Sequence, residues 1–294
     1  MNSSSNAGDP RRQIFAEGLG EGAGRMRMRG RRILVVGGGQ RTTTDAKPPV
    51  GNGRAICQIL AREGAAVVCL DRSREAAEAV CEEIVASGGN AYAEVADVSD
   101  ADAIRPALDR AVARLGGMDG LVLNVGITLG LPLGKLTAKD WDFEYAVNVR
   151  SHMLFSQGAL EVMDAGSSIV IVSSIGAFRP VVESPAYESS KMALIALARS
   201  VAKAGQPSGI RCNALLPGII DTPMGRDEGR RRSGKRGQIV PFGRQGTAWE
   251  VAYAALFLIS NEASYVNAQS LSVDGGYHYG IGLPANGEAP RASG

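Results

Sequence analysis

From residue 33 to residue 273, short apolar runs alternate with longer stretches in which apolar residues recur every three or four positions. The short runs are rich in β-branched residues, which predicts strands, and the longer stretches have the periodicity of amphipathic helices. The predicted strands are Ile33–Val36, Val67–Leu70, Ala91–Val95, Leu121–Asn124, Ile169–Ser173, Ile210–Leu215 and Leu271–Val273, and the predicted helices span residues 53–63, 74–87, 101–115, 138–163, 186–204 and 248–260.

This alternation predicts an α/β fold. Strands that are apolar throughout must be covered on both faces, and the helices between them supply the cover. Right-handed crossovers then give a Rossmann-type, doubly wound parallel sheet of about seven strands with helices on both faces. No internal repeat or linker divides the alternating region, so residues 31–280 are expected to form a single domain.

The two ends of the chain do not follow this pattern. Residues 1–30 are rich in Ser, Gly, Ala and Arg, which predicts a flexible basic extension, with an organelle-targeting peptide as the alternative. The acidic residues Asp9, Glu17 and Glu21 count against the targeting peptide. Residues 281–294 are rich in Gly, Pro and Ala and are expected to form a C-terminal tail.

Composition narrows the classes of protein that remain. Apolar residues make up 45% of the chain and charged residues 21%, a balance typical of globular proteins. The net charge of +2 gives no protein-wide field for nucleic acid or a membrane surface, and no run approaches the ~20 apolar residues of a membrane span. With two histidines and no ligand-like cysteine spacing, no metal site is expected. Cys57, Cys69, Cys81 and Cys212 predict reduced, mostly buried thiols in a cytoplasmic protein.

A glycine-rich turn follows the first predicted strand, and more glycines open the first predicted helix. Glycine permits the tight turn of a dinucleotide site, and a helix N-terminus can receive a pyrophosphate. An ordinary loop would also contain glycines. The residues that this interpretation assigns to a cofactor are Gly37, Gly39, Gly51, Asn52 and Gly53.

Two aspartates follow the second and third predicted strands. Asp71 stands where dinucleotide folds bind the adenosine ribose, and a carboxylate there repels a 2′-phosphate, which favours NAD over NADP. Arg72 beside it leaves NADP open. Asp97 and Val98 are candidates for holding the adenine. The alternatives are that Asp71 is a helix cap or turn residue and that Asp97 or Ser99 caps the following helix.

The candidate chemistry lies in Ser174 and in the stretch from Tyr187 to Lys191. Residues four apart share one helix face, so the Tyr187 phenol and the Lys191 ammonium can enter one site. A nearby cation lowers the pKa of a phenol from its usual value near ~10, which makes a proton donor and acceptor near neutral pH. Ser174 can then orient the reacting oxygen. A Tyr and a Lys four apart also occur on many solvated helices.

The order of these motifs resembles that of the short-chain dehydrogenase/reductase (SDR) family over nearly the whole stretch from Ile33 to Tyr277. Ser174 precedes Tyr187 by 13 residues, as in many members of the family. The matching motifs are the glycine turn, Asp97-Val98, Asn124-Val125-Gly126, Asn148, Ser174, Tyr187-x-x-x-Lys191, Pro217-Gly218 and Asp274-Gly275-Gly276.

The resemblance implies an NAD(H)-dependent oxidoreductase that interconverts a secondary alcohol and a ketone. It implies that Tyr187 is the general acid and base and that Ser174 binds the substrate oxygen. It further implies that Lys191 holds the nicotinamide ribose and that Asn148 anchors a proton-relay water. The other cofactor residues it implies are Asn124 and Gly126 beneath the adenosine ribose, Pro217, Gly218 and Ile219 beside the nicotinamide, and Thr222.

Two other functions remain open, an NADP-dependent carbonyl (3-oxoacyl-type) reductase and a non-catalytic dinucleotide sensor. The complete set of Asn148, Ser174, Tyr187 and Lys191 argues against the sensor. The resemblance also implies a homotetramer and a small-molecule substrate, with no nucleic-acid or membrane partner.

The chain departs from the family in two loops. About ten residues, 41–50, are inserted between Gly37 and Gly51. The insert either bulges outward or folds over the cofactor, and the bulge is favoured because surface insertions cost little. The expected substrate lid, about residues 223–241, has six basic residues among the thirteen from Gly225 to Gly237. They are compatible with an anionic substrate, although a solvated loop is the favoured interpretation.

Overall fold

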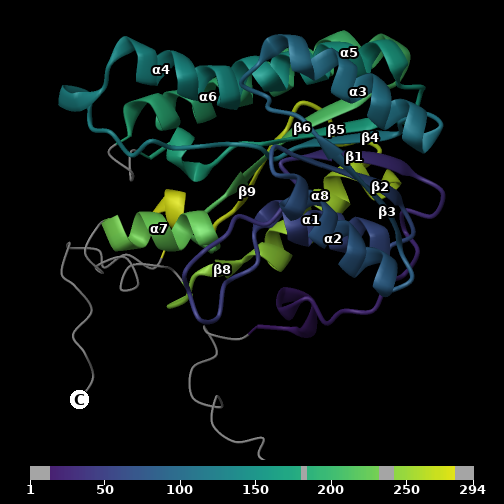
Figure 1. The fold of residues 1–294 in the computed structure, drawn as a ribbon, viewed down its shortest axis with the longest axis horizontal. Coiled ribbons are helices and arrows are strands. Elements are labelled where there is room, and N and C mark those ends of the chain that lie inside the picture. Colours follow the sequence, from purple (N-terminus) through teal and green to yellow (C-terminus); the bar gives the residue numbers. More distant parts are fainter. Residues whose placement is uncertain (1–13, 180–183, 232–241, 282–294) are drawn as a thin grey trace, which may run out of the picture.

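A seven-stranded parallel sheet forms the centre of the computed structural model, which describes residues 14–179, 184–231 and 242–281 (Figure 1). The predicted Rossmann-type, single-domain fold is confirmed, and most strand ends shift by only one or two residues. The strands are β1 (Arg32–Val36), β2 (Ala66–Asp71), β3 (Asn90–Val95), β4 (Gly120–Leu123), β5 (Ser168–Val172), β6 (Arg211–Pro217) and β9 (Ser270–Val273), in the spatial order β3-β2-β1-β4-β5-β6-β9.

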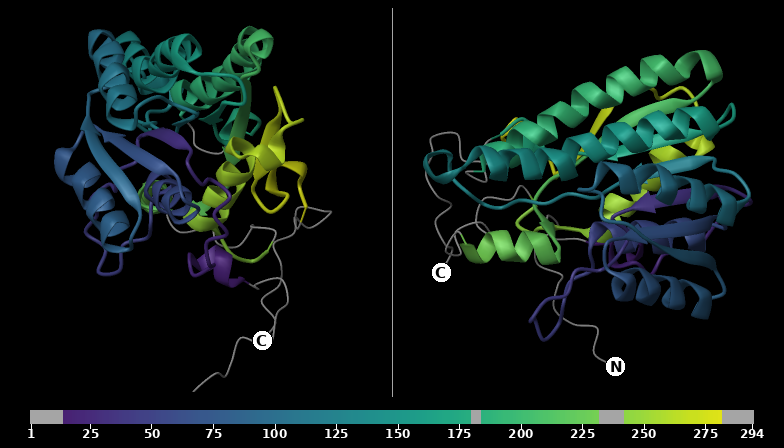
Figure 2. Two further views of the ribbon diagram at one scale, coloured as in Figure 1. Left: turned by 90° about the vertical axis from the view of Figure 1, so that its right-hand side faces the viewer. Right: turned by 45° about the horizontal axis from the view of Figure 1, so that its top comes forward.

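Two groups of helices cover the two faces of this sheet (Figures 1 and 2). Ile33 and Val35 of β1 enter the core beneath one group, and Leu34 and Val36 enter the core beneath the other. The strands are therefore buried on both sides, as their continuous apolar runs predict. One face carries α1 (Asn52–Arg62), α2 (Arg74–Ala86) and α8 (Ala248–Ile259), and the other carries α3 (Ala101–Leu115), α4 (Ala138–Tyr145), α5 (Ser151–Val162) and α6 (Pro185–Gly205).

The direction of strand addition reverses between β1 and β4, which are neighbours in the sheet. The chain first moves from β1 to β2 and β3, and then returns to β4 and continues to the other edge. Ligands of doubly wound sheets bind outside the carboxyl ends of the strands at such a reversal. The segments that follow β1, β4, β5 and β6 therefore meet where a cofactor is expected.

Within the described ranges, none of the helices is long and apolar enough to span a bilayer.

The predicted helix over residues 138–163 contains a wide turn. A π-helical turn over Ala146–Arg150 joins α4 to α5 and has the fully buried Asn148 at its centre. Such turns insert a residue into the helical repeat and are frequent at functional sites. The chain stays helical on both sides of the turn, which is why the sequence pattern predicts a single helix.

Residues 14–30 differ from the expected solvated extension, because they pack against the body of the protein. The buried Glu63 accepts hydrogen bonds from the backbone N–H groups of Arg25 and Arg27 and pairs with the Arg27 guanidinium at 2.6 Å. Met28 is fully buried. Polar and backbone contacts hold this segment in place. Its packing could therefore not be predicted from its few apolar residues. Residues 1–13 and 282–294 lie outside the described part of the chain.

The insert in the glycine turn is closed at its base by Gln40. The Gln40 Oε1 accepts a hydrogen bond from the Gly51 N–H at 2.9 Å, and its Nε2 donates to the Pro49 carbonyl at 3.0 Å. These bonds keep the two halves of the turn adjacent despite the inserted residues.

Beyond this base, the insert reaches α7 (Pro223–Arg231), the helix of the expected lid (Figure 1). Asp45 pairs with Arg226 at 3.3 Å and with Arg230 at 2.9 Å. Arg41 pairs with Asp227 at 3.2 Å. Two of the basic residues in the lid are thus matched with acids, and the lid residues 232–241 lie outside the described part of the chain.

The contacts of Glu63 lead to a prediction about stability. Burial alone would raise the pKa of the Glu63 carboxyl, but its hydrogen bonds with Arg27 and Arg25 hold that pKa below its usual value of 4.5. A lowered pKa adds stability above pH 4.5 that is lost as the pH falls. Glu63→Gln should therefore lower the free energy of unfolding at pH 7 by about 1–3 kcal/mol in urea denaturation, and by less at pH 4.

Glu78→Gln is the matched control, because Glu78 forms an exposed pair with Arg74 on α2. It should change the free energy of unfolding by less than about 0.5 kcal/mol. Equal effects of the two substitutions would show that residues 25–30 are not held by Glu63.

The ion pairs of Asp45 lead to a second prediction. Asp45→Asn should leave the global unfolding midpoint nearly unchanged, because the pairs are partly exposed and screened by solvent. Local opening should become more frequent, so that backbone amides of residues 41–47 and 223–231 exchange with deuterium severalfold faster. Asp109→Asn, which removes an exposed pair with Arg105 on α3, is the control. Unchanged exchange in Asp45→Asn would contradict the contact between insert and lid.

Candidate active site

The glycine turn after β1 packs directly against the start of α1. Gly37 has a φ of +77°, and a Cβ on Gly53 would lie 1.9 Å from the Gly37 carbonyl oxygen. Both positions therefore require glycine. The Asn124 side chain donates a hydrogen bond to the same carbonyl at 2.7 Å, which ties the end of β4 to the turn.

The first turn of α1 has hydrogen-bonding capacity that no described residue uses. Gly51, at the N-cap, has no side chain to cap the helix, and the Asn52 Oδ1 atom is buried without a partner among the described residues. Helix N-termini favour anions because their amide groups and the helix dipole point toward them. The chemistry of this turn fits the pyrophosphate of a dinucleotide.

Asp71 ends β2 beside the turn. Its Oδ2 accepts a hydrogen bond from the Gly39 N–H at 3.1 Å and its Oδ1 accepts one from the Ser73 N–H at 3.2 Å. A Cβ on Gly39 would lie 2.7 Å from Oδ2, so glycine permits this approach. Each carboxylate oxygen has further acceptor capacity, which fits a ribose diol. Arg72, the next residue, is exposed.

Asp97 and Val98 follow β3 at the same edge of the sheet. The Asp97 carboxylate accepts a hydrogen bond from the Ser99 N–H at 2.9 Å. The pKa of Asp97 is lowered first by its bonds with Ser99 and then by the charge of Arg72. Asp100 caps α3, so the alternative that Asp97 or Ser99 caps this helix is wrong.

Two cysteines lie beneath the glycine turn. A Cβ on Gly38 would lie 2.7 Å from the Cys69 Sγ and 2.8 Å from the Cys57 Sγ. A hydrogen bond between Cys69 and Cys57, together with the burial of Cys69, raises the pKa of the Cys69 thiol. This thiol is therefore unreactive. All four cysteines are buried and free, as predicted. In the described ranges, no three His, Cys, Asp or Glu side chains are arranged to hold a metal ion.

Ser174, Tyr187 and Lys191 come together beyond the end of β5. A Cβ on Gly176 would lie 3.4 Å from the Ser174 Oγ and 3.6 Å from the Tyr187 Cε1, so both side chains border one small space. The Lys191 Nζ lies 5.6 Å from the centre of the Tyr187 ring. Because α6 begins at Pro185, the spacing of four residues places the phenol and the ammonium on one helix face.

Lys191 is a buried cation, with only 3% of its surface exposed. Its Nζ donates a hydrogen bond to the Val172 carbonyl at 3.2 Å. Burial lowers the pKa of Lys191 to about 8, while the charge of Glu144 acts in the opposite direction. Lys191 is therefore charged at neutral pH, beside the Tyr187 phenol.

Asn148 holds the chain that follows β4. Its Oδ1 accepts a hydrogen bond from the Ile127 N–H at 2.8 Å, and its Nδ2 donates to the Ile127 carbonyl at 2.9 Å and to the Ser190 Oγ at 3.0 Å. A Cβ on Gly126 would lie 2.9 Å from the Lys191 Nζ and 3.5 Å from the Asn148 Oδ1. Glycine thus leaves room for the ammonium, and Asn148 stands beside Lys191.

The segment after β6 runs along the same edge. The Gly218 N–H donates to the Val273 carbonyl at 2.9 Å, and a Cβ on Gly218 would lie 2.5 Å from the Asp274 Cβ. Thr222 is buried, and its Oγ1 accepts a hydrogen bond from the Gly225 N–H at the start of α7. The structure places Pro217, Gly218, Ile219 and Thr222 on the side of the sheet where the nicotinamide residues are expected.

Glu144 is a charged residue of this region that the motifs did not single out. It is fully buried in α4, and its Oε1 accepts a hydrogen bond from the Leu129 N–H. Glu144 precedes Asn148 by four residues, a spacing that places both on one face of the single helix predicted from the sequence, and both side chains bind the segment that follows β4. This spacing was the signal in the sequence that could have identified it.

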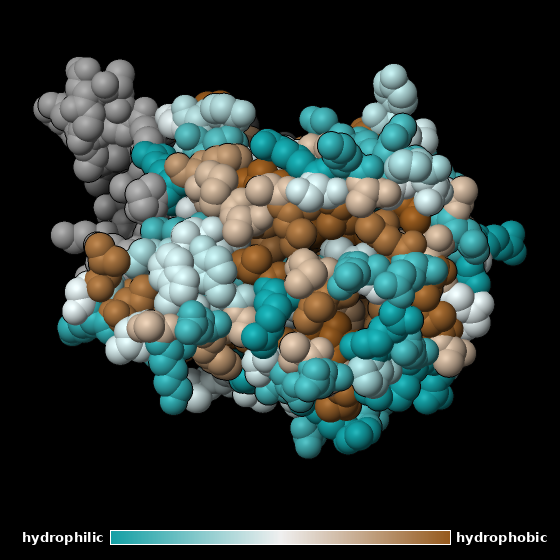
Figure 3. Space-filling view, turned by 90° about the horizontal axis from the view of Figure 1, so that it is seen from above, coloured by the Kyte–Doolittle hydropathy of each residue, from teal (hydrophilic) through white to brown (hydrophobic). Residues whose placement is uncertain are grey.

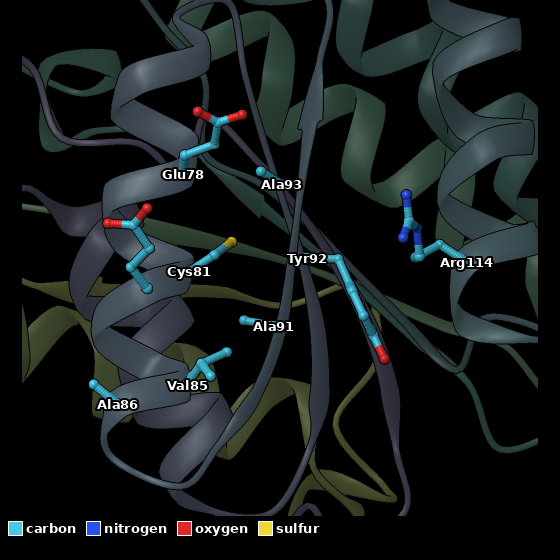
Figure 4. Close-up of a pocket in the computed structure, with 9 residues that line it drawn as sticks. Glu78, Cys81, Val85, Ala86, Ala91, Tyr92, Ala93 and Arg114 are labelled. Atoms are coloured by element: carbon cyan, nitrogen blue, oxygen red, sulfur yellow. The ribbon is translucent and has the colours of Figure 1, made fainter.

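A hollow of about 510 Å³ lies elsewhere, between α2 and the edge strand β3 (Figure 4). Cys81 and Val85 of α2 and Tyr92 of β3 line it, and the Arg114 guanidinium lies 5.4 Å from the centre of the Tyr92 ring. Its lining residues are all outside the predicted site, so it is separate from the cluster around Tyr187.

The chain is similar to a family of known proteins over most of its length. Residues 50–278 match a family model described as enoyl-(acyl carrier protein) reductase. Cyclopentanol dehydrogenase of Comamonas testosteroni is 34% identical over 249 residues, which cover 83% of this chain and 96% of that protein. The 3-oxoacyl-[acyl-carrier-protein] reductase of Thermotoga maritima is 32% identical over 253 residues, which cover 85% of this chain and 99% of that protein.

Solved structures show the same likeness. A short-chain dehydrogenase/reductase from Serratia marcescens superposes with a TM-score of 0.78 at 34% identity, over 86% of this chain and 99% of that one. A short-chain dehydrogenase from Burkholderia cenocepacia, solved in complex with NADP, gives a TM-score of 0.76 at 35% identity, over 85% and 98% of the two chains. The chain therefore belongs to the short-chain dehydrogenases/reductases, a family of oxidoreductases that act on alcohols and ketones with nicotinamide cofactors.

Proposed function

We propose that the protein is an NAD(H)-dependent dehydrogenase that interconverts a secondary alcohol and a ketone, with Tyr187 as the general acid and base. The observation that carries this proposal is the buried Lys191 ammonium, 5.6 Å from the centre of the Tyr187 ring. A cation in a site with little water strongly favours the phenolate form of a neighbouring tyrosine.

In the direction of oxidation, the Tyr187 phenolate takes the proton of the substrate hydroxyl. The Ser174 Oγ accepts a hydrogen bond from the Gly176 N–H at 3.0 Å, which leaves its own proton to stabilise charge on the substrate oxygen. Lys191 also binds the nicotinamide ribose, and Asn148 holds the neighbouring chain and the proton path to solvent. When bound, the nicotinamide supplies the hydride chemistry.

The proposed preference for NAD over NADP rests on Asp71. Its carboxylate lies against the Gly39 N–H of the glycine turn, where the ribose of the adenosine half would bind. A 2′-phosphate at this position would bring two anions together. The start of α1 would bind the pyrophosphate of the cofactor. The residues at this position are Gly51, Asn52 and Gly53.

An NADP-dependent reductase of 3-oxoacyl-type substrates is the second candidate function. The Thermotoga maritima relative is named a 3-oxoacyl-[acyl-carrier-protein] reductase, and the Burkholderia cenocepacia structure holds NADP. In this chain, the exposed Arg72 is the residue that would attract a 2′-phosphate. A non-catalytic sensor is disfavoured because Asn148, Ser174, Tyr187 and Lys191 are all present and adjacent.

We also propose that the protein assembles as a homotetramer. An apolar band crosses the face shown in Figure 3, over the helix layer that contains α4, α5 and α6. Phe143, Met153 and Met192, one on each of these helices, are 42%, 39% and 42% exposed. Large exposed apolar side chains on adjacent helices mark association surfaces.

Three further predictions concern location and domain organisation. They are a cytoplasmic location, a catalytic domain over residues 31–280 and a substrate lid over about residues 223–241.

Tyr187→Phe tests the assignment of the proton donor. Loss of the hydroxyl should lower kcat by about a thousandfold with any active alcohol, because general acid–base catalysis is removed. Cofactor affinity, measured by quenching of protein fluorescence, should change little. Tyr265→Phe, at a fully exposed position, should keep full activity. Substantial turnover by Tyr187→Phe would refute the assignment.

The cofactor proposal is tested by steady-state kinetics with both nicotinamides. The value of kcat/KM should be at least about tenfold higher with NAD+ than with NADP+, because like charges are brought together only with NADP+. Asp71→Ala should reduce this ratio by relieving the repulsion. A higher kcat/KM for NADP+ in the unchanged protein would establish the second candidate function instead.

A further inference from the structure

An acidic and a basic side chain are both buried in the helix layer, on the two contacting helices α4 and α6. Glu144 of α4 is 0% exposed and Lys191 of α6 is 3% exposed. A buried ion is costly unless it is paired and hydrogen-bonded. The Nζ of Lys191 donates a hydrogen bond to the Val172 carbonyl, which carries no net charge. The charge of Glu144 raises the pKa of Lys191 and so opposes the effect of burial on that pKa.

Glu144 also holds the chain that lies between these two helices and the end of β4. Its Oε1 accepts a hydrogen bond from the Leu129 N–H, two residues beyond the Ile127 that Asn148 holds. Glu144 and Asn148 thus hold neighbouring parts of the same segment. The intervening Thr128 contacts Ser184, at the start of the helix that carries Tyr187, with 3.1 Å between their hydroxyl oxygens.

Other titratable groups face Lys191 from the neighbouring elements. His152 of α5 is fully buried, and burial together with the charge of Lys191 lowers the pKa of His152 to about 3. It is therefore neutral at any working pH. Tyr187 faces Lys191 from its own helix. Glu144 is thus the acid on α4 whose charge offsets that of the ammonium.

We propose that Glu144 is a positioning residue of the active site, whose carboxylate balances the Lys191 ammonium while its hydrogen bond holds Leu129 beside the reaction centre. This role rests on the proposed function of Tyr187 and Lys191. Glu144 does not touch the reacting atoms and acts through the lysine. Without its charge, the buried lysine loses its proton at lower pH, and Tyr187 loses the cation that favours its phenolate.

The first test measures Lys191 directly in the protein without cofactor. Lysine labelled with carbon-13 is titrated by NMR, and the Lys191 signal is assigned by its absence from Lys191→Met. The midpoint should lie near 8 in the unchanged protein. In Glu144→Gln, which still offers an oxygen to the Leu129 N–H, the midpoint should fall by about one pH unit. An unchanged midpoint would overturn the proposal.

Two further variants separate charge from packing. Glu144→Asp keeps the carboxylate but shortens the reach to Leu129, so its Lys191 midpoint should stay within about half a pH unit of the original. Asp142→Asn removes an exposed carboxylate from the same helix and should leave the midpoint unchanged. A shift in Asp142→Asn equal to that in Glu144→Gln would overturn the proposal, because the effect would then be a general one of helix charge.

The kinetic test follows the pH profile of kcat/KM with the best substrate. In Glu144→Gln the alkaline limb should move to lower pH by about one unit, with up to about tenfold less activity on that limb and little change where Lys191 is protonated in both proteins. A uniform loss at every pH would overturn the proposal in favour of a structural role.

Failure of the proposed function is distinguishable from failure of this inference. If Tyr187→Phe keeps its turnover but the NMR midpoint shifts in Glu144→Gln, the proposed function is refuted, while the effect of the Glu144 charge on Lys191 is confirmed. If Tyr187→Phe is inactive and the midpoint does not shift, only the role of Glu144 falls.

Discussion

The burial of the Lys191 ammonium is the constraint on which the rest of the site depends. A cation removed from water acts strongly on its neighbours, but it is stable only where the surrounding structure compensates its lost hydration. Here the Val172 carbonyl accepts a hydrogen bond from the ammonium, the charge of Glu144 opposes the effect of burial on its pKa, and Gly126 leaves room for it. Each comes from a different strand, helix or loop, so the ammonium is held beside Tyr187 only in the folded protein.

The strand order explains how these elements meet. Because β4 and β5 are neighbours in a parallel sheet, the chain segments that follow them emerge at the same edge. The segment after β4 passes under α4, where Asn148 and Glu144 hold it. The segment after β5 brings Ser174 toward α6. The same edge carries the glycine turn and α7, which explains how Asp45 of the insert reaches Arg226 despite the 181 residues that separate them.

Much of the fold and the centre of the site could be predicted from the sequence, because both are encoded in local patterns. Continuous apolar runs identify buried strands, and the spacing from Tyr187 to Lys191 identifies one helix face. The packing of residues 14–30 could not be predicted in this way, since it depends on the buried Glu63, more than thirty residues away. The role of Glu144 was missed for the same reason, because a glutamate in an amphipathic helix is ordinarily solvated.

The sequence by itself therefore determined the parallel sheet, the family resemblance and the side chains available for proton transfer, since periodicity and motif spacing are properties of neighbouring residues. Only the tertiary structure decided which charges are buried together and which loops touch. It buried Glu144 and Lys191 on two helices that contact each other and brought the insert against α7, because these arrangements depend on how distant segments pack. Burial also determines how strongly each charge acts on its neighbours, and burial depends on how the whole molecule packs.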